Sequence, residues 1–269
     1  MSTLKYTHAV VCRIPKTYGS DIQNDYPRAK FQHECYVKAL RDTGIDVVEL
    51  PADEAFPMCA FVEDTAVCCN GIALITRPGN HSRLKEAEII KTVLRKELDL
   101  PVIDIADKSA TLDGGDVLFT GKEFFVGVGK YSNEAGARAV AAAFPEYPCT
   151  PIKITENYHL KSLMSIAGPD IICVGSGKTP QDVLNRIKRE ATYSYQTLTV
   201  PEDFAANVLY VNGTLFHRTE KEIPLSFKIF NEKMDCYRQP LDVSELERKS
   251  CGITSCCLLI RRSRHCKIF

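Results

Sequence analysis

The stretch Asp64-Thr-Ala-Val-Cys-Cys-Asn-Gly-Ile-Ala-Leu-Ile-Thr76 contains two short apolar runs separated by Asn70-Gly71. Asn-Gly between two such runs is a strong hairpin signal, because both central residues of the turn adopt positive φ. The pattern recurs around Asn212-Gly213 and, with Thr-Gly-Lys as the turn, over 116–127. A weaker copy runs through 169–175. The sequence therefore predicts several antiparallel strand pairs of one kind.

Amphipathic segments separate these strand pairs and predict helices. The segments are 29–42, 82–98, 133–144, a helix opened by Thr179-Pro180, and 226–234. Two strands followed by a helix and a further strand thus recur about every 45 to 55 residues, which indicates an array of similar ββαβ units. Strand-like runs at both ends, 8–12 and 256–260, would allow the array to close on itself. We expect a single α/β domain over 1–269, and an open α/β sheet is the alternative.

Composition limits the classes of function. The 269 residues carry 34 basic and 34 acidic side chains, and this balance argues against a nucleic-acid partner. No apolar run is long enough to span a membrane, and the N-terminus lacks a secretory signal pattern, so we expect a cytoplasmic protein. Twelve cysteines without any C-x-x-C spacing predict reduced thiols rather than zinc sites or redox dithiols.

Two acidic groups and one histidine are the candidate chemical groups. Glu63-Asp64 and Asp113-Gly-Gly-Asp116 both precede predicted hairpins at equivalent points of the repeat. Equivalent points of a closed array converge on its axis, where paired carboxylates would bind a planar guanidinium cation. His159 follows a polar stretch, at the start of a run that we read as a strand. Solvated strand-end acids and a structural histidine are the alternative interpretations.

These motifs together resemble the dimethylarginine dimethylaminohydrolases, and the resemblance covers nearly the whole chain. It implies the five-bladed pseudosymmetric α/β propeller that this family shares with deiminases and amidinotransferases. The matching segments are Leu50-Pro-Ala-Asp-Glu, Phe61-Val-Glu-Asp, Leu74-Ile-Thr-Arg-Pro-Gly, Ala110-Thr-Leu-Asp-Gly-Gly-Asp-Val-Leu-Phe-Thr-Gly, Glu123-Phe-Phe-Val-Gly, His159-Leu-Lys-Ser, Leu198-Thr-Val-Pro, Val243-Ser-Glu-Leu-Glu and Cys256-Cys.

The resemblance assigns catalytic roles to three residues. Cys256 matches the nucleophile, His159 the general acid and base, and Asp113 the carboxylate that supports the histidine. Deiminases and amidinotransferases usually carry an aspartate two residues after the histidine, whereas this chain has Lys161. That difference favours the dimethylargininase branch.

The resemblance also implies a substrate and a reaction. Glu63 and Asp64 match the acids that bind the guanidinium, and Arg83 matches a ligand of the substrate carboxylate. The implied reaction converts N-ω-methylated arginines to citrulline and methylamine or dimethylamine through a thiouronium on Cys256, with no metal or organic cofactor. The implied partner is a small guanidine, and we expect a monomer or a weak dimer.

Two positions depart from the family pattern. Met58 stands where the family usually has an aspartate for the substrate α-amino group, and Tyr131 stands where it has a second arginine for the carboxylate. Both departures fall on recognition of the amino-acid head. The alternatives are therefore a cysteine hydrolase for a guanidine that lacks this head, and a regulatory relative without turnover.

The basic tail, 261–269, ends in Cys266-Lys-Ile-Phe269. A cysteine at this position fits the C-a-a-X prenylation pattern, and the arginines before it would add electrostatic attraction to a membrane. Cys266 is thus a candidate lipidation site and a route to membrane association. A frayed tail with a fortuitous cysteine is the alternative.

Overall fold

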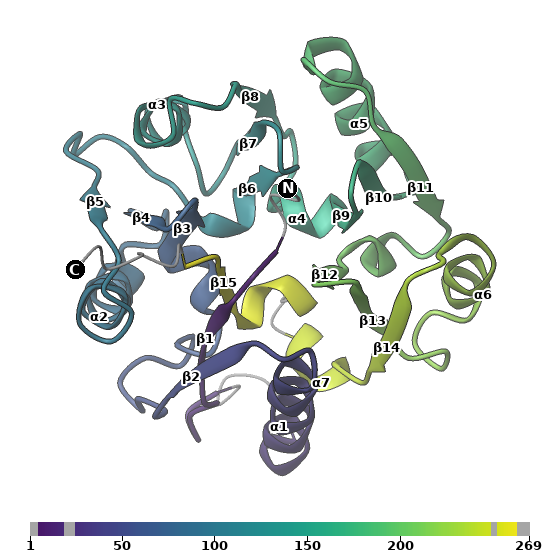
Figure 1. Cartoon of the computed structure of the whole chain (residues 1–269), viewed down its shortest axis with the longest axis horizontal. Helices are drawn as coiled ribbons and strands as arrows, with labels where there is room; N and C mark the ends of the chain where they lie inside the picture. The colour runs from purple at the N-terminus through teal and green to yellow at the C-terminus, as the bar shows by residue number, and fades with distance from the viewer. Residues whose placement is uncertain (1–4, 19–24, 249–251, 263–269) are drawn as a thin grey trace, which may run out of the picture.

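The computed structural model of the chain describes residues 5–18, 25–248 and 252–262. Five three-stranded sheets stand around a common axis (Figure 1). In each sheet the central strand pairs antiparallel with one neighbour and parallel with the other. The predicted five-bladed α/β propeller of ββαβ units is therefore confirmed.

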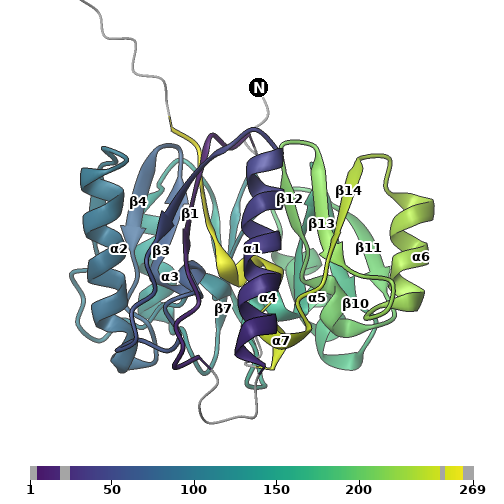
Figure 2. The ribbon, with the colours of Figure 1, turned by 90° about the horizontal axis from the view of Figure 1, so that it is seen from below.

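Each blade places its strands and helix in the same order. The sheets are β15-β1-β2 (Leu258–Ile260, His8–Cys12, Asp46–Leu50), β3-β4-β5 (Ala66–Cys69, Ile72–Ile75, Val102–Asp104), β6-β7-β8 (Val117–Phe119, Phe124–Val128, Cys149–Lys153), β9-β10-β11 (Met164–Gly168, Ile171–Gly175, Gln196–Val200) and β12-β13-β14 (Leu209–Val211, Thr214–Arg218, Tyr237–Leu241). The helices that join the second and third strands of the blades are α1 (Tyr26–Asp42), α2 (Leu84–Lys96), α3 (Glu134–Ala143), α5 (Lys178–Glu190) and α6 (Pro224–Lys233). These helices form the outer wall of the ring (Figures 1 and 2).

The two ends of the chain close the ring in one blade. β15 pairs antiparallel with β1, so that His8 lies opposite Ile260. Figure 1 shows this yellow strand beside the purple one near the centre. The closure rules out the open-sheet alternative, and it brings the segment before β15 next to segments from the first half of the chain.

The hairpin turns agree with the sequence in detail, whereas several boundaries do not. Asn70 and Gly71 have φ of 48° and 76°, and Asn212 and Gly213 have φ of 50° and 97°, as the hairpin signals require. Helix α1 begins at Tyr26 rather than 29, and the strand predicted over 256–260 begins at Leu258, because Cys256 belongs to a 3₁₀ turn. Helix α5 begins at Lys178 with Gly177 as its N-cap, so the predicted N-cap at Thr179 is wrong by two residues. The run after His159 is a helical turn, α4 (Leu160–Leu163), before it becomes β9, because its first hydrogen bond, from Ser162 N to His159 O, is local.

A short helical turn precedes the first strand of every blade. These turns are η1 (Val62–Thr65), η3 (Gly114–Asp116), α4, η4 (Asp203–Ala206) and η5 (Ile253–Cys256). Contacts link η1 to η3 and η5, and α4 to η3 and η4. The predicted convergence of equivalent points on the axis is confirmed, and it positions the polar residues of all five blades around one site.

Three findings concern the remainder of the chain. Every cysteine that the structure describes is a free thiol. Within the described ranges, the helices are too short or too polar to cross a lipid bilayer. Cys266, the candidate lipidation site, lies outside the described residues.

Candidate active site

A pocket of about 220 Å³ lies where the helical turns meet. Seven of the predicted site residues line it: Met58, Glu63, Asp64, Arg83, Asp113, Tyr131 and His159. The eighth, Cys256, is not among the described residues that line it. The pocket also contains Asn80, Lys161, Thr254 and Ser255, to which the sequence analysis assigned no role in the site.

His159 and Asp113 form a hydrogen-bonded pair. The imidazole Nε2 lies 2.9 Å from Oδ2 of Asp113, and Oδ1 of Asp113 accepts a hydrogen bond from the backbone of Gly79 at 2.8 Å. Although burial lowers the pKa of His159, the negative charge of Asp64 and the bond to Asp113 outweigh it and raise this pKa to about 9. The imidazole is therefore protonated at neutral pH, so it can donate a proton to a leaving group.

Asp116 fixes the backbone that carries His159. Its Oδ1 accepts from the backbone N–H of Leu160 at 2.9 Å, and its Oδ2 accepts from the hydroxyl of Ser132 at 2.6 Å. The same hydroxyl accepts from the backbone of Asp113 at 3.0 Å. Burial raises the pKa of Asp116 to about 6. One buried network thus orients both members of the His159–Asp113 pair.

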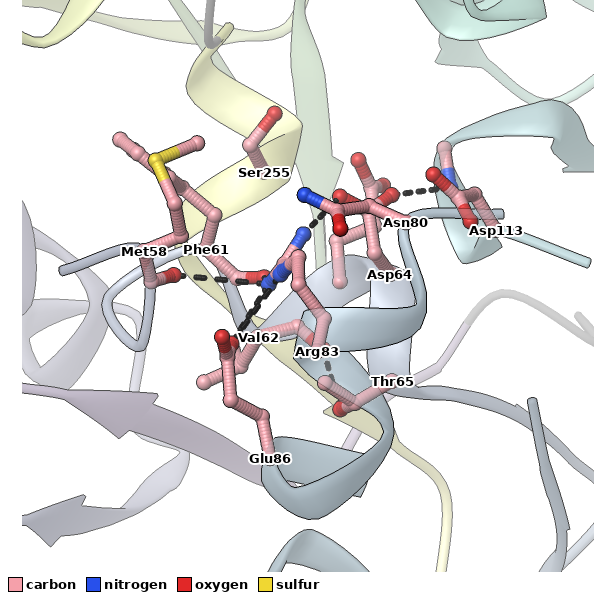
Figure 3. Close-up of polar contacts among 12 residues, drawn as sticks. Met58, Phe61, Val62, Asp64, Thr65, Asn80, Arg83, Glu86, Asp113 and Ser255 are labelled. Carbon is pink, nitrogen blue, oxygen red and sulfur yellow. Dashed lines mark hydrogen bonds and ion pairs between the residues drawn. The ribbon is translucent and has the colours of Figure 1, made fainter. Parts of the chain in front are cut away.

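Arg83 neutralises the acid predicted to bind a substrate. Its Nη1 donates to Asp64 at 2.6 Å, its Nε and Nη2 donate to Glu86 at 3.1 and 2.9 Å, and its Nη2 also donates to the backbone oxygen of Phe61 at 2.7 Å (Figure 3). Arg83 is 5% exposed, and the carboxylates of Asp64 and Glu86 raise its pKa. Its contact with a substrate carboxylate stays a prediction, because most of its donors serve the protein itself.

Lys161 forms an ion pair with Glu63, as Arg83 does with Asp64. Its Nζ donates to Oε1 of Glu63 at 2.8 Å, and the hydroxyl of Thr254 donates to Oε2 at 2.8 Å. These three residues also line a second cavity of about 140 Å³, so they form the partition between it and the pocket. Lys161 belongs to the His-Leu-Lys-Ser motif, and this motif is the sequence feature from which its place in the site could have been predicted.

Met58 and Tyr131, the two residues that depart from the family pattern, both line the pocket. The ring of Tyr131 packs on the imidazole of His159, with 4.2 Å between ring centroids and 30° between planes. Met58 lines the pocket by its side chain and accepts from Nη2 of Arg83 at its backbone oxygen, at 3.4 Å. An aromatic ring and a thioether therefore stand where the family pattern has charged groups.

Thr254 and Ser255 are the residues of turn η5 that line the pocket, and Cys256 is not among them. Cys256 is 1% exposed and belongs to an apolar cluster with Tyr36 and Ile253. Burial raises the pKa of its thiol, and the negative charge of Glu63 adds to this. The hydroxyl of Ser255 accepts a hydrogen bond from the backbone of Gly252 at 3.2 Å, within the same turn. The assignment of Cys256 as the nucleophile stays a prediction.

Asp64, Asp113 and His159 are the group best placed to hold a cation. Their ligand atoms all lie within 4.8 Å of one another, so their spacing would suit a metal ion. Arg83 already neutralises Asp64, and the protonated imidazole already neutralises Asp113. Both carboxylates of this group are thus already paired with positive charges of the chain.

Comparison with known proteins agrees with the fold. No model of a known protein family matches the sequence. The chain is 32% identical to the Bos taurus protein named "Putative hydrolase DDAH2", over 96% of each chain, and equally identical to the Homo sapiens protein of that name. It is 28% identical to the N(G),N(G)-dimethylarginine dimethylaminohydrolase (DDAH) of Pseudomonas aeruginosa, over 80% of this chain and 85% of that one.

Solved structures show the same architecture. A mutant of the Pseudomonas aeruginosa DDAH complexed with citrulline is 25% identical, covers 95% of this chain and 99% of its own, and has a TM-score of 0.81. The N-terminal domain of the cyanobacterial arginine dihydrolase ArgZ shares the fold, with a TM-score of 0.77 at 15% identity. These findings place the chain in the superfamily of guanidine-modifying α/β propellers, the penteins. Within it, the chain belongs to the dimethylarginine dimethylaminohydrolase family.

Proposed function

We propose that the protein is a guanidine hydrolase that converts N-ω-methylated arginines and water to citrulline and methylamine or dimethylamine. One observation carries the proposal: the hydrogen-bonded His159–Asp113 pair lies in the same pocket as Glu63 and Asp64. This pocket thus combines a proton donor with carboxylates for a planar cation, which are the groups that cleavage of a guanidine requires.

The proposed reaction has two halves. A thiolate of Cys256 attacks the guanidinium carbon, and His159 protonates the departing amine, which leaves a thiouronium on the sulfur. His159 then takes a proton from water, the water oxygen attacks the same carbon, and the sulfur leaves as citrulline is released. The structure sets one requirement for this route: the thiol of Cys256, which is 1% exposed and is not among the residues that line the pocket, must become accessible to the substrate.

The substrate cation also has to share acids that are already paired. Asp64 is bonded to Arg83 and Glu63 to Lys161, so a guanidinium would bind by taking up carboxylate lone pairs that these bonds leave open. Met58 and Tyr131 remove two charged contacts to an amino-acid head. A lost charged contact costs about 1.5 to 3 kcal/mol, which favours testing guanidines without this head beside methylated arginines.

The second candidate function is guanidinium binding without turnover. The observation in its favour is that the thiol of Cys256 is buried and is not among the groups that line the pocket, since turnover requires an accessible thiolate. Such a relative would use the same acids and the same histidine for recognition alone.

One set of assays separates these functions. Release of dimethylamine and citrulline is measured for asymmetric dimethylarginine, monomethylarginine and simple alkylguanidines, and binding of each is measured by calorimetry. The hydrolase proposal predicts turnover that C256S and H159Q abolish and that C236S, a matched control at a partly exposed thiol outside the pocket, retains. If only the alkylguanidines were turned over, the substrates would be guanidines that lack the amino-acid head. Binding without any turnover would establish the second candidate.

A further inference from the structure

Two cysteines of the described chain hold their sulfurs against one another outside the pocket. Cys12 ends strand β1 and is 4% exposed, whereas Cys59 lies in the connection between β2 and η1 and is partly exposed. The backbone oxygen of Arg13 lies 3.6 Å from the sulfur of Cys12 and 3.9 Å from the sulfur of Cys59. Cys59 also packs against the apolar cluster that contains Cys12, and the two thiols are near enough to shift each other's pKa. They are therefore in contact across 47 positions of sequence.

The two thiols differ in accessibility and in acidity. The interaction with Cys12 lowers the pKa of Cys59, whereas the interaction with Cys59 and burial raise the pKa of Cys12. A partly exposed thiol of lowered pKa is the one that an oxidant attacks first, because the thiolate is the reactive form. A buried thiol beside it is suited to act as the resolving partner.

We propose that Cys12 and Cys59 form a reversible disulfide when the protein meets a peroxide. In the first step the thiolate of Cys59 attacks hydrogen peroxide, the O–O bond breaks, and a sulfenic acid and hydroxide form. In the second step the sulfur of Cys12 attacks the sulfenic sulfur, the S–O bond breaks, and water leaves. The two thiols together lose two electrons and two protons, and the peroxide is reduced to two waters.

The cross-link would act on a wall of the pocket. Cys59 follows Met58, and the backbone oxygen of Met58 accepts from both Arg83, at 3.4 Å, and the backbone of Phe61, at 2.9 Å. A disulfide would fasten this connection to strand β1. The inference does not rest on the proposed hydrolysis, since it concerns a modification that occurs whether or not the pocket turns over a substrate.

The test is peroxide treatment of the reduced full-length protein, followed by mass spectrometry. We expect a loss of about 2 Da per chain at low peroxide, reversed by dithiothreitol. Trypsin alone leaves Cys59 on the same peptide as Cys68 and Cys69, so a second cut after Glu63 is needed to assign the bond. The mapped peptides should join Cys12 to Cys59. The oxidised protein should also melt several degrees higher, because the link restricts the unfolded chain.

Matched variants complete the test. C59S should abolish the linked peptide, and C35S, which removes an exposed thiol outside the pair, should retain it. C12S should leave Cys59 to accumulate as a sulfenic acid that dimedone traps. The proposal is overturned if the wild-type bond maps to another pair of cysteines. It is equally overturned if Cys59 of the wild-type protein passes to sulfinic acid while Cys12 stays a free thiol.

Discussion

The guanidinium of Arg83 lies 2.6 Å from the carboxylate of Asp64, the acid that the sequence assigns to the guanidinium of a substrate. A cation of the chain therefore occupies part of the position that the ligand would need. Both groups are nearly buried, as is Glu86 on the other side of Arg83. Although burial acts to raise the pKa of Asp64, the positive charges of His159 and Arg83 lower it, so this carboxylate is held ionised and in place before any ligand arrives.

Removing Arg83 should destabilise the protein strongly. R83M leaves Asp64 and Glu86 as buried carboxylates without their cation, so we expect the free energy of unfolding to fall by about 3 to 5 kcal/mol. R138M is the control, because Arg138 is exposed and its pair with Glu134 is a surface contact that contributes at most about 1 kcal/mol. Urea denaturation measures both. Equal losses for the two variants would show that the buried cluster contributes no more than a surface pair.

The stability of the protein should depend on pH through His159. Because the folded pKa of about 9 lies above the ordinary value, the stabilisation is fully present below pH of about 6.5 and is lost as pH rises through 9. The shift corresponds to no more than about 3 kcal/mol. Denaturation of wild type and H159Q at several pH values measures the difference, which should shrink from pH of about 6 to 9.5. A pH-independent difference would refute the assignment of this charge.

Restoring an acid at Met58 should favour ligands with an amino-acid head. M58D would add a charged contact to an α-amino group, so the Kd for asymmetric dimethylarginine should fall about tenfold or more. The Kd for a simple alkylguanidine should stay the same. M58L is the control for side-chain volume, and calorimetry reports each value. If the Kd of M58D for the alkylguanidine were lower than that of the wild-type protein, the new carboxylate would bind the guanidinium instead.

Alkylation can locate the side chains of turn η5. Cys256 is buried, so iodoacetamide should modify it slowly in the native protein, whereas the thiol of S255C faces the pocket and should react quickly. Peptide mapping follows each site separately. Rapid modification of Cys256 in the wild-type protein would show that the turn already presents this thiol to the pocket without a ligand.

Much of the fold follows from local sequence, and the convergence of the site follows from the repeat. Asn70-Gly71 and Asn212-Gly213 specify their turns because few other residues tolerate positive φ. Glu63 and Asp113 precede strands at equivalent positions, and a closed ring brings such positions together. The five-bladed propeller was predicted from the resemblance to a known family rather than from any one motif.

Other features of the site depend on tertiary packing and could not be predicted. The pairing of Lys161 with Glu63 joins residues 98 positions apart and depends on the neighbouring blades. Which residues of turn η5 line the pocket depends on how this turn packs against η1, from another part of the chain. The helical turn after His159 is too short for its periodicity to be read, so the apolar residues there suggested a strand.

The central claim is that a guanidinium binds between Glu63, Asp64 and His159. The most direct measurement is a crystal structure of the protein soaked with asymmetric dimethylarginine at saturating concentration. We predict the guanidine carbon in the axial pocket, with its nitrogens within hydrogen-bond distance of at least one of these carboxylates. Density for the ligand in the cavity beyond the Glu63–Lys161 partition, in an outer groove, or nowhere would contradict the account.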